Sequence, residues 1–181
     1  MKIDIGRRAL HVEQAGQGPT ILLVHGFPLD HSMWRGQLTG LSDAYRVVAP
    51  DLRGFGASDP APGDATMQAL ADDLALLLDA LAITEPITFC GLSMGGYVGW
   101  QFFLRHRARL SRLIQCDTRA AADTPEGRQL RLKAAETTLA QGVAPLVATM
   151  MPKLFAPQTE QQQPELVEQT RQVMLATSPS E

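Results

Sequence analysis

Four short strand-like segments, separated by helical ones, limit the fold of this chain more than any other sequence feature. They occupy residues 20–24, 45–49, 86–90 and 110–116, and residues 21–24 are all apolar. A short, continuous apolar run is typical of a strand buried on both faces. Strands that alternate with helices form right-handed βαβ units, which build a parallel sheet. We therefore expect an α/β fold with a mostly parallel sheet and flanking helices.

The clearest helix is expected at residues 65–82. Apolar side chains recur there at the i, i+3, i+4 and i+7 spacing that places them on one helix face. Asp64 or Thr66 can cap its first turn. Residues 51–63 contain several glycines and prolines and are expected to form a loop. The remaining expected elements of this part are strands at 2–5 and 9–14 and helices at 31–42 and 94–106.

The character of the sequence changes after Asp117. The segment 124–176 shows helical patterns only, interrupted by prolines, and residues 160–163 are expected to be a polar connector. We therefore expect two parts, an α/β core over residues 1–120 and a helical cap region over residues 121–181. The helices expected in the second part lie at 126–141, 143–151 and 164–176.

The charge balance and the few cysteines exclude several classes of protein. The chain has 16 Lys and Arg against 19 Asp and Glu, and the resulting net charge of −3 argues against a nucleic-acid-binding protein. No apolar run approaches the about 18 residues that a membrane span needs, and the first residues lack the apolar core of a signal peptide. The two cysteines indicate no disulfide framework, and no Cys/His cluster has zinc spacing. We expect a cytoplasmic protein with no cofactor, metal ion, membrane or nucleic acid as a partner.

The residues Gly91-Leu92-Ser93-Met94-Gly95 match the pattern G-x-S-x-G and lie between an expected strand and an expected helix. In that setting a sharp turn lifts the serine hydroxyl above the end of the sheet, where it can act as a nucleophile. The N–H groups that begin the following helix favour a developing negative charge. The bare pattern also occurs in ordinary strand–helix turns, so its position in the chain carries the argument.

Two further loops follow expected strands. The sequence HGFP at residues 25–28 comes directly after one strand, and DLRGFGAS at residues 51–58 comes after the next. Together with the serine motif, and in this order, they resemble the α/β-hydrolase superfamily over residues 1–117. All three motifs stand at the carboxyl ends of strands, where open α/β sheets place their sites. Asp51 and Arg53 could be a charged catalytic pair, but the resemblance favours a role in shaping the loop.

The resemblance implies a role for each matching residue. Ser93 would be the nucleophile that attacks a carbonyl carbon. The backbone N–H groups of Phe27 and Met94 would form the oxyanion hole. The residues that would shape the loops around this site are His25, Gly26, Gly91 and Gly95.

The substrate class also comes from the resemblance. Residues 113–120 and 122–127 look like those of the 3-oxoadipate enol-lactonase and small-esterase group. This implies a small carboxylic ester or lactone as the substrate. A perhydrolase or haloperoxidase-like enzyme without cofactor would use the same serine and the same fold.

The sequence departs from the resemblance at the general base, the residue that takes the proton of the serine. A serine hydrolase needs a histidine that takes the serine proton, and in this fold the acid and the histidine follow the serine in the chain. The last histidine is His106. Its 13 positions from Ser93 correspond to about 20 Å along a helix, which is too far. Asp117 is a possible acid, or else a carboxylate that caps a turn.

We therefore expect the N-terminal part of a longer hydrolase, which by itself has little or no activity. The alternative is a non-catalytic fragment or binding module of the same fold. An uncovered strand edge at residues 110–116 would favour self-association or binding of a complementing C-terminal fragment.

Overall fold

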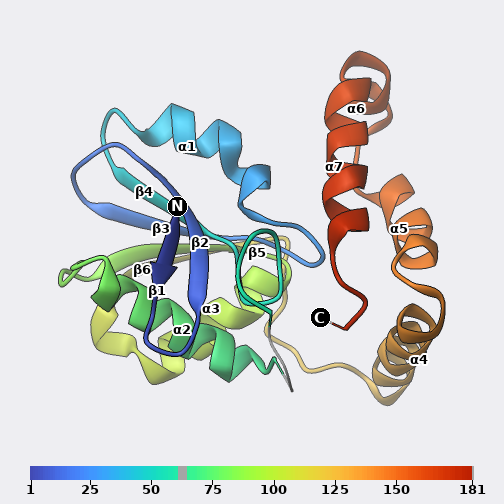
Figure 1. Ribbon diagram of the computed structural model, residues 1–181, viewed down its shortest axis with the longest axis horizontal. Coiled ribbons are helices and arrows are strands. Elements are labelled where there is room, and N and C mark those ends of the chain that lie inside the picture. The colour runs from blue at the N-terminus through green and yellow to red at the C-terminus, as the bar shows by residue number, and fades with distance from the viewer. Residues whose placement is uncertain (61–64, 181) are drawn as a thin grey trace. The chain divides into compact units, whose positions relative to one another are not determined.

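The computed structural model describes residues 1–60 and 65–180, and the chain divides into two compact units, Met1–Ala120 and Ala121–Glu181. The first unit is built around a six-stranded sheet (Figure 1). Its strands are β1 (Lys2–Asp4), β2 (Ala9–Ala15), β3 (Thr20–Val24), β4 (Arg46–Pro50), β5 (Ile87–Leu92) and β6 (Leu110–Cys116).

The strand order is β1-β2-β4-β3-β5-β6. β3 runs parallel to both of its neighbours, since Leu22 pairs with Val48 of β4 and with Phe89 of β5. β5 and β6 are also parallel, whereas β2 is antiparallel to β1 and to β4. The mostly parallel sheet predicted from the sequence is thereby confirmed. The chain leaves β3 toward one side and returns on the other, and ligands bind at such switch points in open sheets.

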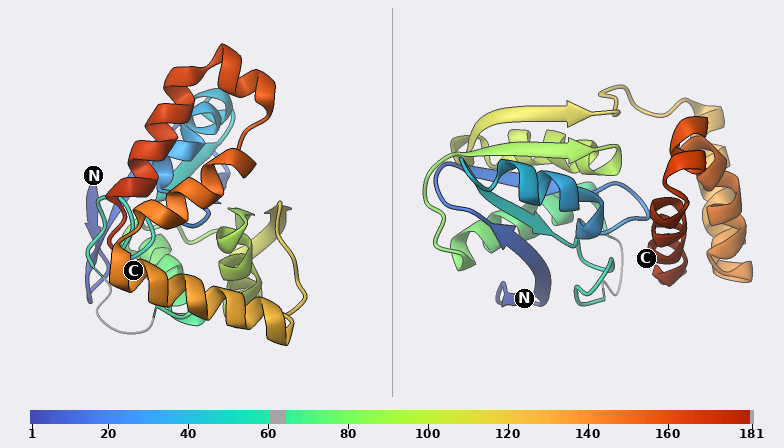
Figure 2. Two further views of the ribbon diagram at one scale, coloured as in Figure 1. Left: turned by 90° about the vertical axis from the view of Figure 1, so that its right-hand side faces the viewer. Right: turned by 90° about the horizontal axis from the view of Figure 1, so that it is seen from above.

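Helices cover both faces of this sheet (Figure 1, Figure 2). One face packs against a larger apolar cluster and the other against a smaller one. The helices on the first face are α2 (Met67–Ala80) and α3 (Met94–Arg105), and those on the second are the short 3-10 helix η1 (His31–Trp34) and α1 (Arg35–Leu41).

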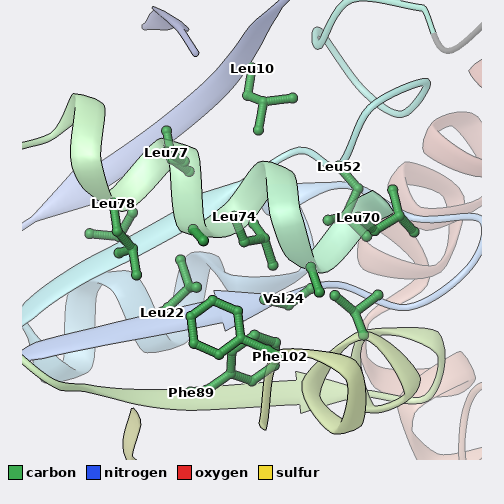
Figure 3. Packing of buried hydrophobic residues seen from close by; sticks show 14 of the residues in the cluster. Leu10, Leu22, Val24, Leu52, Leu70, Leu74, Leu77, Leu78, Phe89 and Phe102 are labelled. Atoms are coloured by element: carbon green, nitrogen blue, oxygen red, sulfur yellow. The ribbon is translucent and has the colours of Figure 1, made fainter. Parts of the chain in front are cut away.

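The larger cluster anchors the strand that leads to the serine motif. Phe89 of β5 and Phe102 of α3 are fully buried, with ring centroids 5.4 Å apart. Figure 3 shows both rings beside Leu22 of β3 and near Leu74 of α2. Full burial of a large apolar side chain contributes about 1.5–3 kcal/mol. The packing therefore fixes β5 and α3 relative to each other, and with them the turn that joins the two.

The helix starts differ slightly from those expected. Thr66 Oγ1 accepts a hydrogen bond from Ala69 N at 3.2 Å, so α2 begins at Met67. Asp64, the other candidate cap, lies outside the described residues, as do residues 61–63 of the expected loop. The helix expected at 31–42 begins as a 3-10 turn, because Asp30 Oδ1 accepts from Ser32 N at 2.9 Å.

The second unit is helical throughout its described residues. Its helices are α4 (Pro125–Gln141), α5 (Ala144–Met150), η3 (Met151–Lys153), α6 (Pro157–Gln162) and α7 (Pro164–Ala176). The connector expected at 160–163 is wrong in large part, because α6 extends to Gln162 after a proline at its first turn. Across residues 1–60 and 65–180, no helix has both the length and the apolar character that crossing a membrane requires.

Candidate active site

Ser93 stands at the turn between β5 and α3. Its backbone has φ 51° and ψ −110°, and such a conformation costs a residue other than glycine about 1–3 kcal/mol. Two hydrogen bonds hold the turn: Ser93 N donates to Cys116 O at 2.9 Å, and Thr118 Oγ1 donates to Ser93 O at 2.8 Å. The end of β6 therefore fixes the partly buried serine at the carboxyl edge of the sheet.

Glycines let three pieces of backbone approach at this turn. A Cβ atom added at Gly91 would collide with the backbone of Gly95, and one added at Gly95 would lie 2.8 Å from the carbonyl oxygen of His25. A Cβ atom at Gly26 would lie 3.4 Å from Ser93 Cβ. The loop after β3 thus packs directly against the serine, although its residues are far from Ser93 in the sequence.

Met94 and Phe27 carry the two candidate oxyanion donors. Met94 is the first residue of α3, and a first-turn N–H has no acceptor within its own helix. The positive end of the helix dipole favours negative charge there. Phe27 follows Gly26 directly, so its N–H belongs to the loop that packs against Ser93. Both donors lie on the segments that meet at the serine, and their role in catalysis stays a prediction.

His25 is fully buried, and both nitrogens of its ring have partners. Leu52 N donates to Nε2 at 3.0 Å, so Nδ1 carries the proton and faces Gly26 O at 3.0 Å. Burial lowers the pKa of His25, which keeps the ring neutral. The ring therefore links the loops that follow β3 and β4, and neither nitrogen is left to accept a proton from Ser93.

We expect His25 to make the folded protein sensitive to acid. Burial lowers its pKa in the folded state, whereas an unfolded chain binds the proton at about pH 6.5. The stability contribution is therefore complete above about pH 6.5, and below it falls by at most about 1.4 kcal/mol per pH unit. Urea unfolding at about pH 7.5 and 5.5 should show a smaller pH dependence for His25→Gln than for the unchanged protein. Equal pH dependence in both proteins would contradict this assignment.

Asp51 is buried at the end of β4 and organises the loop that follows. Its Oδ1 accepts from the backbone N and from Nδ1 of His31, both at 2.7 Å, and its Oδ2 accepts from Ala57 N at 2.9 Å. Burial alone would raise the pKa of Asp51, but these hydrogen bonds lower it. The hydrogen bond between the two side chains raises the pKa of His31. Arg53 pairs instead with buried Asp73 of α2. Asp51 and Arg53 have separate partners, which favours loop shaping over a catalytic pair.

Among residues 1–60 and 65–180, no side chain is placed at Ser93 as the general base of a serine hydrolase. In the part of the chain that the structure describes, none of the four histidines hydrogen-bonds to Ser93. His106 follows the far end of α3, where its Nε2 lies 2.8 Å from Asp72 Oδ1. Asp117 directly follows β6, with a left-handed φ of 42° and an exposed side chain. Its role as the acid stays a prediction.

The sequence did not reveal two residues that position this site. Thr118 bonds to Ser93 across 25 residues of sequence, and its side chain occupies the space that a Cβ atom at Gly96 would need. Asp73 reads as an ordinary polar position of α2, yet it is 2% exposed and holds Arg53. Thr118 lies in the stretch 113–120 and Asp73 in the helix expected at 65–82, but those patterns do not reveal contacts with partners in other elements.

The chain resembles known proteins along most of its length. The alpha/beta hydrolase fold family matches residues 19–176. The 3-oxoadipate enol-lactonase 1 of Acinetobacter baylyi is 34% identical over 163 residues, which is 90% of this chain and 59% of that protein. A solved thermophilic esterase from Thermogutta terrifontis is 45% identical, with a TM-score of 0.93 over 99% of this chain and 67% of the esterase. The enol-lactonase from Burkholderia xenovorans is 30% identical, with a TM-score of 0.91 over 99% of this chain and 69% of that structure.

The chain spans 59% of the curated enol-lactonase and about two thirds of the two solved structures. Both structural matches cover 99% of this chain, so they include its six-stranded sheet. With the family matched from residue 19 to residue 176, the chain belongs to the alpha/beta hydrolase fold family.

Proposed function

We propose that this chain supplies the nucleophile and the oxyanion hole of a hydrolase that acts on a small carboxylic ester or lactone. Ser93 would attack the carbonyl carbon, and the N–H groups of Phe27 and Met94 would stabilise the resulting oxyanion. Loss of one such donor typically costs about 3–4 kcal/mol of transition-state stabilisation. The observation that carries the proposal is the strained backbone of Ser93, packed against Gly26 at the first turn of α3. The esterase and enol-lactonase relatives support the substrate class.

The base of the reaction would be supplied from outside these 181 residues. The chain spans about two thirds of its solved relatives, and its last histidine is His106. Asp117 is the candidate acid within the chain, and the helical unit 121–181 would serve as the cap. A non-catalytic module of the same fold is the second candidate, and the absence of a histidine bonded to Ser93 among the described residues favours it.

Labelling of Ser93 by a fluorophosphonate tests the proposal, because the probe needs an activated serine. We expect little labelling of the 181-residue chain alone. Labelling should appear at Ser93 once the chain is mixed with the part of the A. baylyi enol-lactonase that lies beyond their match. Ser93→Ala is the control and should stay unlabelled. If the two pieces form a folded complex and Ser93 still does not react, the binding module is favoured and the hydrolase proposal is overturned.

A further inference from the structure

Outside the serine turn, two histidines and a glutamate from two segments of the first unit lie close together. His11 and Glu13 lie two positions apart on β2, so both side chains are on one face of the strand. His31 opens η1. One potential ligand atom of each residue lies within 4.8 Å of those of the other two. We propose that these three side chains bind a divalent transition-metal ion, with Zn²⁺ as the representative.

The spacing of the donor atoms suits such an ion. Two ligand atoms that each lie about 2.0–2.1 Å from a tetrahedral zinc ion are about 3.3 Å apart. His11 Nε2 and Glu13 Oε1 are 3.2 Å apart, and the rings of His11 and His31 have centroids separated by 4.8 Å. The Glu13 side chain is 49% exposed, and its ion pair with the Met1 amino group, at 3.7 Å, is weak enough for a metal ion to displace. The two histidine side chains are 19% and 22% exposed, so Glu13 is the ligand that would rotate most freely toward the ion.

Asp51 prepares His31 for this role. Because an ionised carboxylate only accepts hydrogen bonds, the 2.7 Å contact makes Nδ1 of His31 the donor and leaves the lone pair on Nε2. The backbone N of His31 donates to the same oxygen at 2.7 Å, so the carboxylate holds both the ring and the main chain. A carboxylate behind a metal-bound imidazole fixes the tautomer and increases the basicity of the ligand, and such partners recur in metal sites.

His11 is held by its main chain. Its N donates to Ser58 Oγ at 2.8 Å, and its carbonyl oxygen accepts from Asp51 N at 2.9 Å. The three segments that carry the ligands and their support are thus joined before any ion binds. A bound ion would cross-link β2 to η1, close in sequence to the loop that packs against Ser93.

The types of ligand select the class of ion. Imidazole nitrogen suits Zn²⁺, Ni²⁺ and Cu²⁺, whereas Mg²⁺ and Ca²⁺ prefer sites built from oxygen alone. Three protein ligands leave one position for water, as in zinc sites that are open to solvent. The neighbouring group of Asp30, His31 and Asp51 is less suitable, because its oxygens already accept hydrogen bonds from His31 and Ser32.

This site could not be predicted from the sequence, because Glu13 and His31 are 18 positions apart and the pattern matches no zinc motif. Titration of the metal-free chain with Zn²⁺ against a chromophoric indicator tests the proposal. We expect one ion per chain. Because loss of a partner behind a ligand already costs about 10–100-fold in affinity, His11→Gln and Glu13→Gln, which remove ligands, should each lose at least that much. His106→Gln is the matched control, because His106 faces a carboxylate but no second histidine; it should bind Zn²⁺ like the unchanged chain.

A second measurement, the melting temperature, shows for each variant both that it folds and whether Zn²⁺ stabilises it. An ion that binds only the folded state raises the melting temperature, so Zn²⁺ should raise it by similar amounts in the unchanged chain and in His106→Gln, and by less in His11→Gln. Glu13 is exposed, so Glu13→Gln is expected to fold normally. A dissociation constant for Zn²⁺ above about 100 μM, which corresponds to a binding free energy weaker than about −5.5 kcal/mol, would overturn the proposal. Equal affinity in the unchanged chain, His11→Gln and Glu13→Gln would overturn it as well.

Discussion

Ser93→Ala should leave the ester hydrolysis of the 181-residue chain unchanged, but should lower kcat by about 10⁶-fold once a base histidine is supplied. Without a base the serine hydroxyl stays protonated, and only binding and the oxyanion hole contribute, about 10³–10⁴ over water. Both effects of Ser93→Ala can be measured as hydrolysis of p-nitrophenyl acetate. The assay is run with the 181-residue chain alone and with the added part of the A. baylyi enol-lactonase that lies beyond their match.

The matched control for this experiment is Ser111→Ala. Ser111 is an exposed serine of β6 and should affect neither measurement. Rapid hydrolysis by the 181-residue chain that is lost in Ser93→Ala would contradict the prediction, because it would show that a base is already present. A complete catalytic complex in which Ser93→Ala has no effect would place the nucleophile elsewhere.

Asp73→Ala should destabilise the first unit by about 3–5 kcal/mol, because it leaves a buried charge without its partner. Asp73 is 2% exposed and accepts from Nε and Nη2 of Arg53, whose side chain is 11% exposed. Arg8 Nε also lies 3.8 Å from the same carboxylate. Urea unfolding followed by tryptophan fluorescence measures the loss, and both tryptophans, Trp34 and Trp100, lie in this unit.

The preceding residue provides a close control. Asp72 pairs with Arg105 at 2.7 Å, but both side chains are exposed, so Asp72→Ala should cost far less. Equal losses in the two variants would contradict the assignment. The double variant Arg53→Met, Asp73→Leu should recover much of the stability, because an apolar pair replaces the buried charges.

The strands and the larger helices could be predicted because their signals are local. The apolar run of β3 and the leucine spacing of α2 each lie within one element, and burial follows from them. α6 was missed because its sequence, Pro157–Gln162, has no apolar face for periodicity to detect. The 3-10 start of the helix expected at 31–42 depends on one side chain, Asp30, whose Oδ1 accepts a hydrogen bond from Ser32 N.

The strand–turn–helix setting of Ser93 could also be predicted from a local pattern. Its serine and glycines are encoded in short motifs, because the turn needs those residues at fixed spacing. The contacts that hold the serine turn and the neighbouring loops were not predictable, since Thr118, Asp73 and the His25–Leu52 contact act between elements. The roles of Phe27, Met94 and Asp117 stay predictions that the kinetic and labelling experiments address.

The central place of β3 has a consequence during synthesis. Its two partner strands are translated after it, and β5 begins 63 residues beyond Val24, from residue 24 to residue 87. At a translation rate of about 5–20 residues per second, the edge of β3 that pairs with β5 stays unpaired for about 3–13 s. Unpaired edges of apolar strands recruit other chains. The nascent chain is therefore expected to need chaperone protection until β5 has left the ribosome.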